Sequence, residues 1–307
     1  MPANSSIEWT DATWNPTTGC SRVSKGCDNC YAMMMARRFD GQGNGYDGTT
    51  RRTKQGTDWT GVVKMHEDRL REPLSWRKPR LVFVDSMSDL FHPSVPFEFI
   101  DKVWAAMALA PTHIFQILTK RPERMAEYLS AGEEELRSRW SQAAQETFSR
   151  MWMQEYPLDN VWVGTSVENK EVTERIDNLR SIEAAVRFLS LEPLIGPLSD
   201  LELGGIDWVI VGGESGSNAR PIRPNWVRSI RNACDSANVP FFFKQWGAWA
   251  PRSAISDALA DQSNVMTFDD HGRSETRVYR VGKGKAGREL DGQTWDQMPE
   301  EVQLLLA

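Results

Sequence analysis

The 307-residue sequence lacks several features that would place it in a specialised class of protein. It has no apolar run of about eighteen residues, so no transmembrane helix is expected. No basic and then apolar leader opens the chain at MPANSSIEWTD, and without an export signal we expect a cytoplasmic protein. The 40% hydrophobic and 25% charged residues exclude disorder, collagen and coiled coil as descriptions of the whole chain.

The chain has fewer basic than acidic residues, 36 against 42, and the basic residues are unevenly distributed. The net charge of −6 argues against a protein that coats nucleic acid in bulk. Residues 1–80 nevertheless contain 13 Lys and Arg against 9 Asp and Glu, a net of +4, whereas the remaining residues carry 23 against 33, a net of −10. This asymmetry is either ordinary surface scatter or an anion-tolerant entrance close to the cysteines of the first segment.

Cysteine is scarce, yet three of the four cysteines lie within eleven residues. Cys20, Cys27 and Cys30 have the spacing C-x6-C-x2-C in the glycine-containing loop TTGCSRVSKGCDNCYA. The fourth, Cys234, falls on a predicted helix, where we expect it to be a buried small apolar residue. Clustered cysteines in a reducing compartment indicate metal or redox chemistry rather than disulfides.

Three thiolates in one loop favour a four-iron, four-sulfur cluster in which one iron has no protein ligand. Zinc is the alternative, although a structural zinc site needs four ligands and the nearest histidines, His66 and His92, are far along the chain. A loop without any metal is the third possibility. An iron that lacks a protein ligand can hold a substrate or cofactor, so the three-cysteine set points to catalysis.

Short apolar, β-branched runs alternate with helical stretches, which predicts an α/β fold with a parallel sheet. About eight strand candidates favour a (β/α)-barrel of the TIM type, full or partial, with a doubly wound open sheet as the runner-up. The strand candidates are residues 7–14, 62–65, 81–85, 113–118, 161–164, 186–189, 208–211 and 241–243, and the helix candidates are residues 97–110, 171–182 and 225–238.

Two domains are expected: a barrel over residues 1–250 and a C-terminal appendage over residues 251–307. The appendage contains a predicted hairpin, with strands at Val265–Phe268 and Arg277–Val281 around the turn Asp269-Asp270-His271-Gly272. An inserted amphipathic helix is predicted near residues 133–156. Its apolar face, which we expect to be core, comprises Leu136, Trp140, Ala144, Phe148 and Trp152.

Polar residues follow six of the predicted strands at the point where each strand ends. Because the carboxyl ends of parallel barrel strands face the same side, these residues are expected to meet at one rim that carries the active site. They are Asp85, Ser86, Ser88 and Asp89, then Thr119, Lys120 and Arg121, then Ser166 and Glu168, then Glu192, then Glu214, and finally Lys244 and Gln245.

Several ordered motifs resemble a known family. They are WNPTTGCSRVSKGCDNCYAMMMARR, FVDSMSDLFH, FQILTKRPERM, VWVGTSVEN, VRFLSLEPLIGP, DWVIVGGESGSNARP and FFFKQWG. Together they look like the three-Cys-motif, radical-SAM-like family of phage and bacterial proteins, over residues 7–250 and the later segment GRELDGQTW.

The chain also resembles, more distantly, the radical S-adenosylmethionine superfamily, which places a three-cysteine loop after the first strand of a partial barrel. It departs from the usual C-x3-C-x2-C spacing: the first gap is six residues, Asn29 precedes the last cysteine, and the aromatic Tyr31 follows it. The superfamily's Gly-Gly-Glu segment lies at the second strand, whereas Gly212-Gly213-Glu214 lies near the seventh. The motif DSMSD is an equally good candidate for holding the cofactor.

The resemblance implies an enzyme with a four-iron, four-sulfur cluster on Cys20, Cys27 and Cys30. S-Adenosylmethionine would bind the fourth iron, and its reductive cleavage would give a deoxyadenosyl radical that modifies or repairs a nucleic-acid-related or phosphate-bearing substrate. The implied catalytic residues are Lys120, Glu168, Glu192 and Lys244, and the implied cofactor-binding residues are Ser86, Ser88, Asp89, Gly212, Gly213 and Glu214.

The resemblance also implies partners. An electron donor such as flavodoxin or ferredoxin would reduce the cluster, a nucleic acid or nucleotide is the candidate substrate, and a protein with a three-Cys motif is a candidate partner. The alternative function is a non-catalytic iron–sulfur module that binds or senses together with a partner protein.

Overall fold

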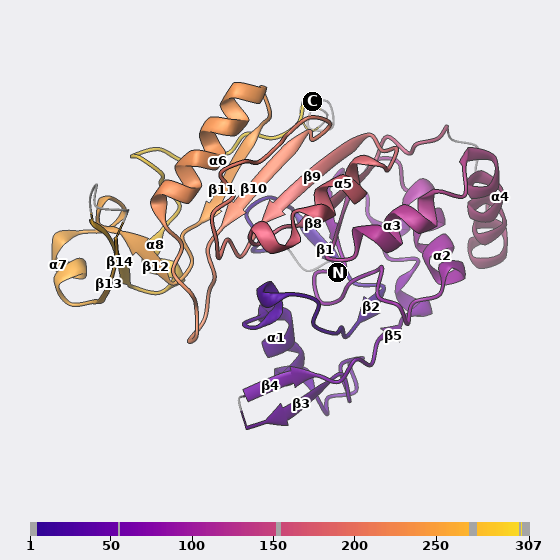
Figure 1. Ribbon diagram of the computed structural model, residues 1–307. Helices are drawn as coiled ribbons and strands as arrows, with labels where there is room; N and C mark the ends of the chain where they lie inside the picture. The colour runs from indigo at the N-terminus through magenta and orange to yellow at the C-terminus, as the bar shows by residue number, and fades with distance from the viewer. Residues whose placement is uncertain (1–4, 55, 152–154, 270–274, 301, 303–307) are drawn as a thin grey trace.

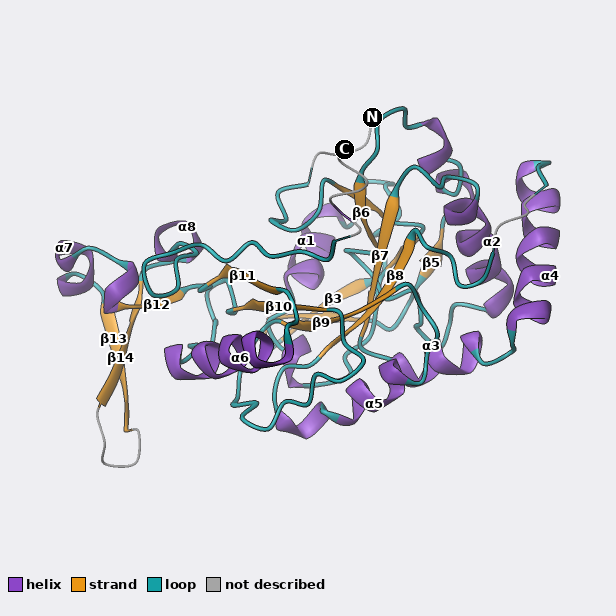
Figure 2. Cartoon of the chain, turned by 90° about the horizontal axis from the view of Figure 1, so that it is seen from above, coloured by secondary structure: helices purple, strands orange, loops and turns teal. Residues whose placement is uncertain are grey.

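The computed structural model describes residues 5–54, 56–151, 155–269, 275–300 and 302. Its centre is an all-parallel sheet of seven strands in the order β1-β6-β7-β8-β9-β10-β11, which curls into a half-barrel flanked by helices (Figures 1 and 2). The strands are β1 (Ala12–Trp14), β6 (Leu81–Val84), β7 (Ile114–Thr119), β8 (Val161–Ser166), β9 (Val186–Leu191), β10 (Trp208–Gly212) and β11 (Phe241–Gln245).

The order of the strands in the sheet follows their order in the chain, which confirms the partial barrel over the doubly wound sheet. A doubly wound sheet reverses its strand order at a switch point, and the described strands show no such reversal. The candidate at residues 62–65 is not a barrel strand. Its residues Lys64–Met65 form β5, which pairs antiparallel with β2 (Thr17–Thr18) outside the main sheet.

The strands are buried on both faces because the half-barrel is packed inside and outside. Successive side chains of a strand point to opposite faces. Val163 and Val209 pack outward in the core beneath the helices, whereas Trp162 and Trp208 fill the concave side. Trp9, from the segment before β1, inserts into the same concave cluster. Packing on both faces explains why the strands appear in the sequence as near-continuous apolar runs.

No helix in the described ranges is both long enough and apolar enough to cross a bilayer.

Helices cover the convex face of the sheet. The helices that follow β6, β7, β8 and β10 are α2 (Phe97–Ala108), α3 (Pro122–Leu129), α5 (Glu174–Arg180) and α6 (Pro224–Ala237), and the short 3-10 helices are Lys25–Cys27, Glu67–Arg69, Pro73–Ser75, Lys170–Val172 and Arg252–Ala254. Three of them, α2, α5 and α6, match the predicted helices.

The predicted inserted helix is α4 (Glu133–Ala143), which continues into a π-helical turn at Ala144–Phe148. It ends there, short of the predicted residue 156, because Ser149 adopts a left-handed conformation. Its apolar face is core, as expected: Leu136, Trp140, Ala144 and Phe148 are all buried. Trp152, the last residue of the expected face, lies outside the described residues.

A small substructure between the first two barrel strands was not predicted. It consists of α1 (Tyr31–Phe39), directly after the third cysteine, and a hairpin of β3 (Thr50–Thr53) and β4 (Gly56–Trp59). Trp59 packs with the buried face of α1 in a hydrophobic cluster that is separate from the main core and includes Met87 from the segment after β6. The substructure therefore projects from the barrel on a separate core (Figure 1).

The C-terminal appendage contains the predicted hairpin, formed by β13 (Asn264–Asp269) and β14 (Glu275–Arg280), with β12 (Trp249–Pro251) alongside β14. The turn residues 270–272 lie outside the described residues. Two short helices, α7 (Asp257–Asp261) and α8 (Lys283–Ala286), complete this part of the chain.

The end of the chain then returns to the barrel. The backbone N–H of Phe243 donates to the carbonyl of Trp295 at 2.9 Å, and Asp296 forms a bridge with Phe242. Leu290 is fully buried in the main core. Residues on both sides of the predicted boundary at residue 250 therefore contribute to the main core, and the division into two domains stays a prediction.

Candidate functional site

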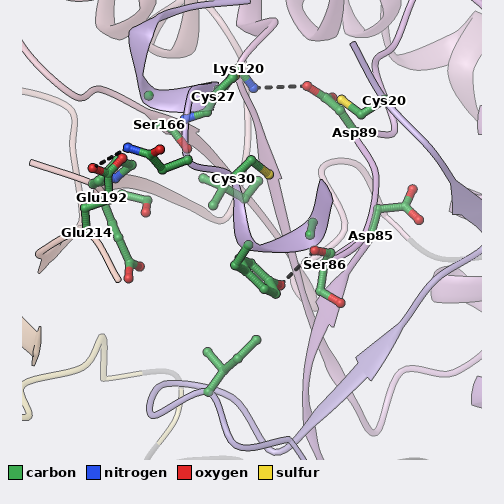
Figure 3. A pocket seen from close by; sticks show the side chains of 18 of the residues that line it. Cys20, Cys27, Cys30, Asp85, Ser86, Asp89, Lys120, Ser166, Glu192 and Glu214 are labelled. Carbon is green, nitrogen blue, oxygen red and sulfur yellow. Dashed lines mark hydrogen bonds between the residues drawn. The ribbon is translucent and has the colours of Figure 1, made fainter. Parts of the chain in front are cut away.

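A cavity of about 420 Å³ lies where the carboxyl ends of the strands meet the cysteine loop (Figure 3). A volume of this size suits a small organic ligand. The cavity brings together most of the residues singled out in the sequence. Those that line it are Cys20, Cys27, Cys30, Asp85, Ser86, Ser88, Asp89, Thr119, Lys120, Arg121, Ser166, Glu192, Gly213, Glu214, Lys244 and Gln245.

Alternate residues of each strand point into the half-barrel. These inward residues are apolar deep in the half-barrel and polar near the carboxyl ends of the strands. On β9, Phe188 packs in the concave cluster, while Ser190 and the following Glu192 line the cavity. On β8, Trp162 and Ser166 are related in the same way. Inward positions therefore change from aromatic to polar as each strand approaches its carboxyl end.

The three cysteines come from three short elements of one loop. Cys20 follows β2 and Gly19, whose φ of 91° favours glycine and where a Cβ would overlap the carbonyl of Val62. Cys27 ends the 3-10 helix Lys25–Cys27, and Cys30 caps the N-terminus of α1. All three are free thiols that line the cavity.

Burial opposes the thiolate form of these cysteines. It raises the pKa of Cys20 to about 12, and it also raises the pKa of Cys30, although hydrogen bonds from the backbone at Met33 and Ala32 act in the opposite direction. Each thiolate also disfavours its neighbour, since Cys30 raises the pKa of Cys20 and Cys27 raises that of Cys30. Three thiolates here need a cationic partner.

Across the described ranges of the chain, no group of three or more Cys, His, Asp or Glu side chains is arranged to hold a single metal ion. The three thiols instead border a cavity that is open beside them.

Arg121 and Asp89 support the loop beside Cys20. Arg121 donates to the Asp89 carboxylate at 2.7 Å, to the Ser21 carbonyl at 3.1 Å and to Cys20 Sγ at 3.9 Å. Both side chains of the ion pair are only 7% exposed. Ser88 Oγ adds a hydrogen bond of 2.6 Å to the carbonyl of Gly19. Asp89 and Ser88 thus hold the loop that carries Cys20.

Glu168 lies beneath the loop and does not line the cavity. It accepts hydrogen bonds from Ser24 Oγ at 2.7 Å, from Lys120 Nζ at 2.5 Å and from Arg175 at 3.2 Å. Burial favours a higher pKa for Glu168, but the charges of Lys120 and Arg175 and the hydrogen bonds from Lys120 and Ser24 hold its pKa below the usual value. A Cβ on Gly26 would overlap this carboxylate, which explains the glycine.

Glu214 holds the other side of the loop. Its carboxylate accepts hydrogen bonds from Asn29 Nδ2 at 2.9 Å and from Arg220 Nη2 at 2.5 Å. Arg220 also donates to the carbonyl of Lys25 at 2.9 Å. A Cβ on Gly213 would overlap the carbonyl of Trp246, so a close backbone approach requires this glycine.

The pair of Glu192 and Lys244 is the ion pair most open to the cavity. Their charged atoms lie 2.8 Å apart, and the two side chains are 21% and 13% exposed. Gly212, on the strand between them, leaves the room that Glu192 occupies, because a Cβ there would be 3.0 Å from the Glu192 carboxyl carbon. Ser166 and Ser190 line the same cavity.

Sequence reasoning missed the partners of the loop. Asn29, Arg175 and Arg220 were not singled out, although Arg220 lies within the motif GGESGSNARP. The arginines could have been suspected from the number of carboxylates expected to be buried at one rim, since buried carboxylates are paired. The assigned cofactor-binding and catalytic roles of the strand-end residues stay predictions.

A protein family model with the description "Protein of unknown function (DUF5131)" matches residues 4–299, which is nearly the whole chain. No curated protein matches the chain, and no solved structure does.

Proposed function

We propose a function for this chain, which belongs to the DUF5131 family, from the chemistry of its cavity. It is an iron–sulfur enzyme of the radical S-adenosylmethionine type that acts on a nucleic-acid-related or phosphate-bearing substrate in the cytoplasm, where thiols remain reduced. The observation that carries the proposal is that three thiols of one loop line the same cavity as the charged carboxyl edge of a parallel half-barrel.

The surroundings of the thiols fit a four-iron, four-sulfur cluster. The cluster would be held by Cys20, Cys27 and Cys30, with one iron left open to the cavity. Negative charge on these ligands is offset by Arg121 beside Cys20 and by Lys120, which favours the thiolate of Cys30.

The histidines near the loop do not complete a zinc site. His92 Nδ1 accepts a hydrogen bond from the backbone N–H of Ser94 at 3.2 Å, so Nε2 carries the proton and donates to Ser21 Oγ at 2.8 Å. His66 Nε2 lies 2.8 Å from Thr18 Oγ1. A structural zinc ion needs a fourth ligand, and these contacts favour the cluster over zinc.

S-Adenosylmethionine suits the remainder of the cavity. When bound to a reduced cluster, this cofactor supplies a deoxyadenosyl radical. Glu192 and Lys244 carry the charges opposite to those of its ammonium and carboxylate, and both line the cavity and are more exposed than Asp89 and Arg121, which also line it. Trp9, Phe83 and Leu118 line the apolar part of the cavity, against which an adenine can pack.

The decisive experiment is anaerobic reconstitution with iron and sulfide, followed by dithionite and S-adenosylmethionine. We expect about four irons per chain, and formation of methionine and deoxyadenosine. Cys20→Ala, Cys27→Ala and Cys30→Ala should each lose the cluster. Cys234→Ala is the matched control, because Cys234 is buried on α6 and does not line the cavity.

Glu192→Gln tests the cofactor site separately. It should retain the iron and require a higher concentration of S-adenosylmethionine for cleavage, because one charge-assisted contact worth roughly 1.5–3 kcal/mol is lost. An intact cluster that never cleaves S-adenosylmethionine would reject the enzyme and favour the non-catalytic module that works with a partner protein. Stoichiometric zinc without iron would reject the cluster itself.

A further inference from the structure

We propose that α1 and the β3–β4 hairpin form a basic arm that binds single-stranded nucleic acid beside the cavity. The arm comprises the described residues 31–54 and 56–59, and three of them, Tyr31, Ala32 and Trp59, line the cavity. Binding by the arm is independent of the cluster. The further step, in which the arm presents a base to the cavity for modification, rests on the proposed function.

The arm is basic although the protein is acidic. Residues 31–59 contain five Lys and Arg against three Asp and Glu, whereas the whole chain carries −6. Two of the three acids are already paired, Asp40 with Arg37 and Asp58 with both Arg22 and Arg51. Three further cations are exposed and form no salt bridge with any other residue that the structure describes: Arg38, Arg52 and Lys54.

An exposed stripe on α1 connects these cations with the cavity. Tyr31, Met34 and Arg38 are all exposed, at a spacing that places them on one face of the helix. Tyr31 lines the cavity, its side chain is 54% exposed, and its hydroxyl donates to the carbonyl of Ser86 at 2.8 Å. The ring is therefore a fixed aromatic surface at the edge of the cavity.

This combination fits a single strand better than other anions. Lysine and arginine side chains bind phosphates, and exposed aromatic rings stack on unpaired bases. A base within a duplex reaches the cavity only after extrusion. An acidic peptide would use the cations but not the ring.

The test is fluorescence anisotropy with the purified holoprotein and labelled 15-mers of dT and of U, a DNA duplex and poly-glutamate. We expect binding of both single strands and weaker binding of the duplex and the peptide. Arg52→Ala/Lys54→Ala should weaken single-strand binding roughly 10- to 30-fold at 0.1 M salt and lower the salt slope by about 1.4, as expected for two lost phosphate contacts.

The matched control is Arg77→Ala/Lys78→Ala, which also removes one arginine and one lysine from exposed positions. These residues lie just before β6, at the amino ends of the strands, whereas the cavity lies at the carboxyl ends. The control should leave binding unchanged. Tyr31→Leu should weaken binding about 5- to 100-fold with an unchanged salt slope, while Tyr31→Phe retains the ring and the affinity.

If Arg52→Ala/Lys54→Ala and Arg77→Ala/Lys78→Ala lose single-strand affinity equally, the proposal that the arm binds nucleic acid is wrong. Preference for the duplex or for poly-glutamate would also contradict it. Absence of binding at 0.1 M salt would do the same. None of these outcomes affects cluster assembly or cleavage of S-adenosylmethionine, so failure of the arm is distinguishable from failure of the proposed function. Single-strand binding without any cleavage would support the arm and reject the enzyme.

Discussion

Each of three buried carboxylates around the cysteine loop is paired with an arginine: Asp89 with Arg121, Glu168 with Arg175, and Glu214 with Arg220. Removal of one partner from such a pair leaves an uncompensated buried charge, which is more costly than the loss of the pair as a whole. These residues consequently set the position of the loop, and the pair most open to a ligand is the one between Glu192 and Lys244.

Asp85 is a buried carboxyl that forms no salt bridge with an arginine in the described part of the chain, and its burial predicts a pH-dependent stability. Burial, and to a smaller extent the charge of Asp89, raise its pKa to about 8, although hydrogen bonds from the Thr17 backbone and hydroxyl, at 3.0 and 2.9 Å, and the charge of Arg69 act in the opposite direction. Between about pH 4 and pH 8 the unfolded chain releases a proton that the folded chain retains. The free energy of unfolding therefore falls as the pH rises through this window.

Asp85→Asn should remove that dependence. Asparagine tolerates the φ of 58° at this position and keeps an acceptor for Thr17. Urea denaturation at pH 5 and at pH 8 should show a loss of stability for the unsubstituted protein, at most about 1.4 kcal/mol per pH unit from this group, and a smaller loss for the variant. An equal loss of stability between pH 5 and pH 8 in Asp85→Asn and in the unsubstituted protein would contradict a raised pKa at Asp85.

At the scale of elements, the cysteine loop is shaped by its contacts with the ends of distant strands. Ser24 on the loop is bonded to Glu168 after β8, and Asn29 is bonded to Glu214 after β10. Gly26 lies directly against the Glu168 carboxylate. The loop can therefore bring three thiols to one cavity without regular secondary structure over most of its length.

Gly26→Ala should displace the loop while the barrel stays folded. The new Cβ would overlap a carboxylate that Lys120 and Arg175 hold in place and that cannot move aside cheaply. We expect a several-fold lower iron content after reconstitution, measured by a colorimetric iron assay, with an unchanged circular dichroism spectrum. Gly204→Ala, with open space around its Cβ position, is the control. Full iron loading of Gly26→Ala would contradict this account.

At the scale of the whole molecule, segments from both ends of the chain complete the half-barrel. Trp9, Met298 and Val302 all belong to the concave cluster, and Lys283 lies 3.4 Å from Glu8 beside the cavity. The edge strand β11 is covered by the returning segment around Trp295. A seven-stranded open sheet thus avoids exposure of its interior and of its last edge.

Leu290→Ala should destabilise the entire barrel rather than the appendage alone. Leu290 is fully buried in the main core, so truncation should lower the free energy of unfolding by about 2–5 kcal/mol in a single cooperative transition. Val265→Ala, at a position 53% exposed on the hairpin, should change it by less than about 0.5 kcal/mol. Thermal and urea denaturation measure both. Two separate transitions would show that the residue-250 boundary is energetically real.

The sequence by itself determined the parallel α/β barrel and the common edge of its polar residues. Both follow from local patterns: buried strands appear as apolar runs, and parallel strands place their carboxyl ends on one side. Glu192, Glu214 and Lys244 reached the cavity for this reason. The three closely spaced cysteines likewise needed only the spacing of the chain to be recognised as one group.

The tertiary structure decided which of those residues face the cavity and which support the loop. Glu168 and Glu192 look alike in the sequence, since each follows a strand by one or two residues, yet one is buried under the loop and the other lines the cavity. The contact between Asn29 and Glu214 spans 185 residues. Pairings of this kind depend on how the sheet curls and which side chains burial brings together, and neither is written in a local pattern of residues.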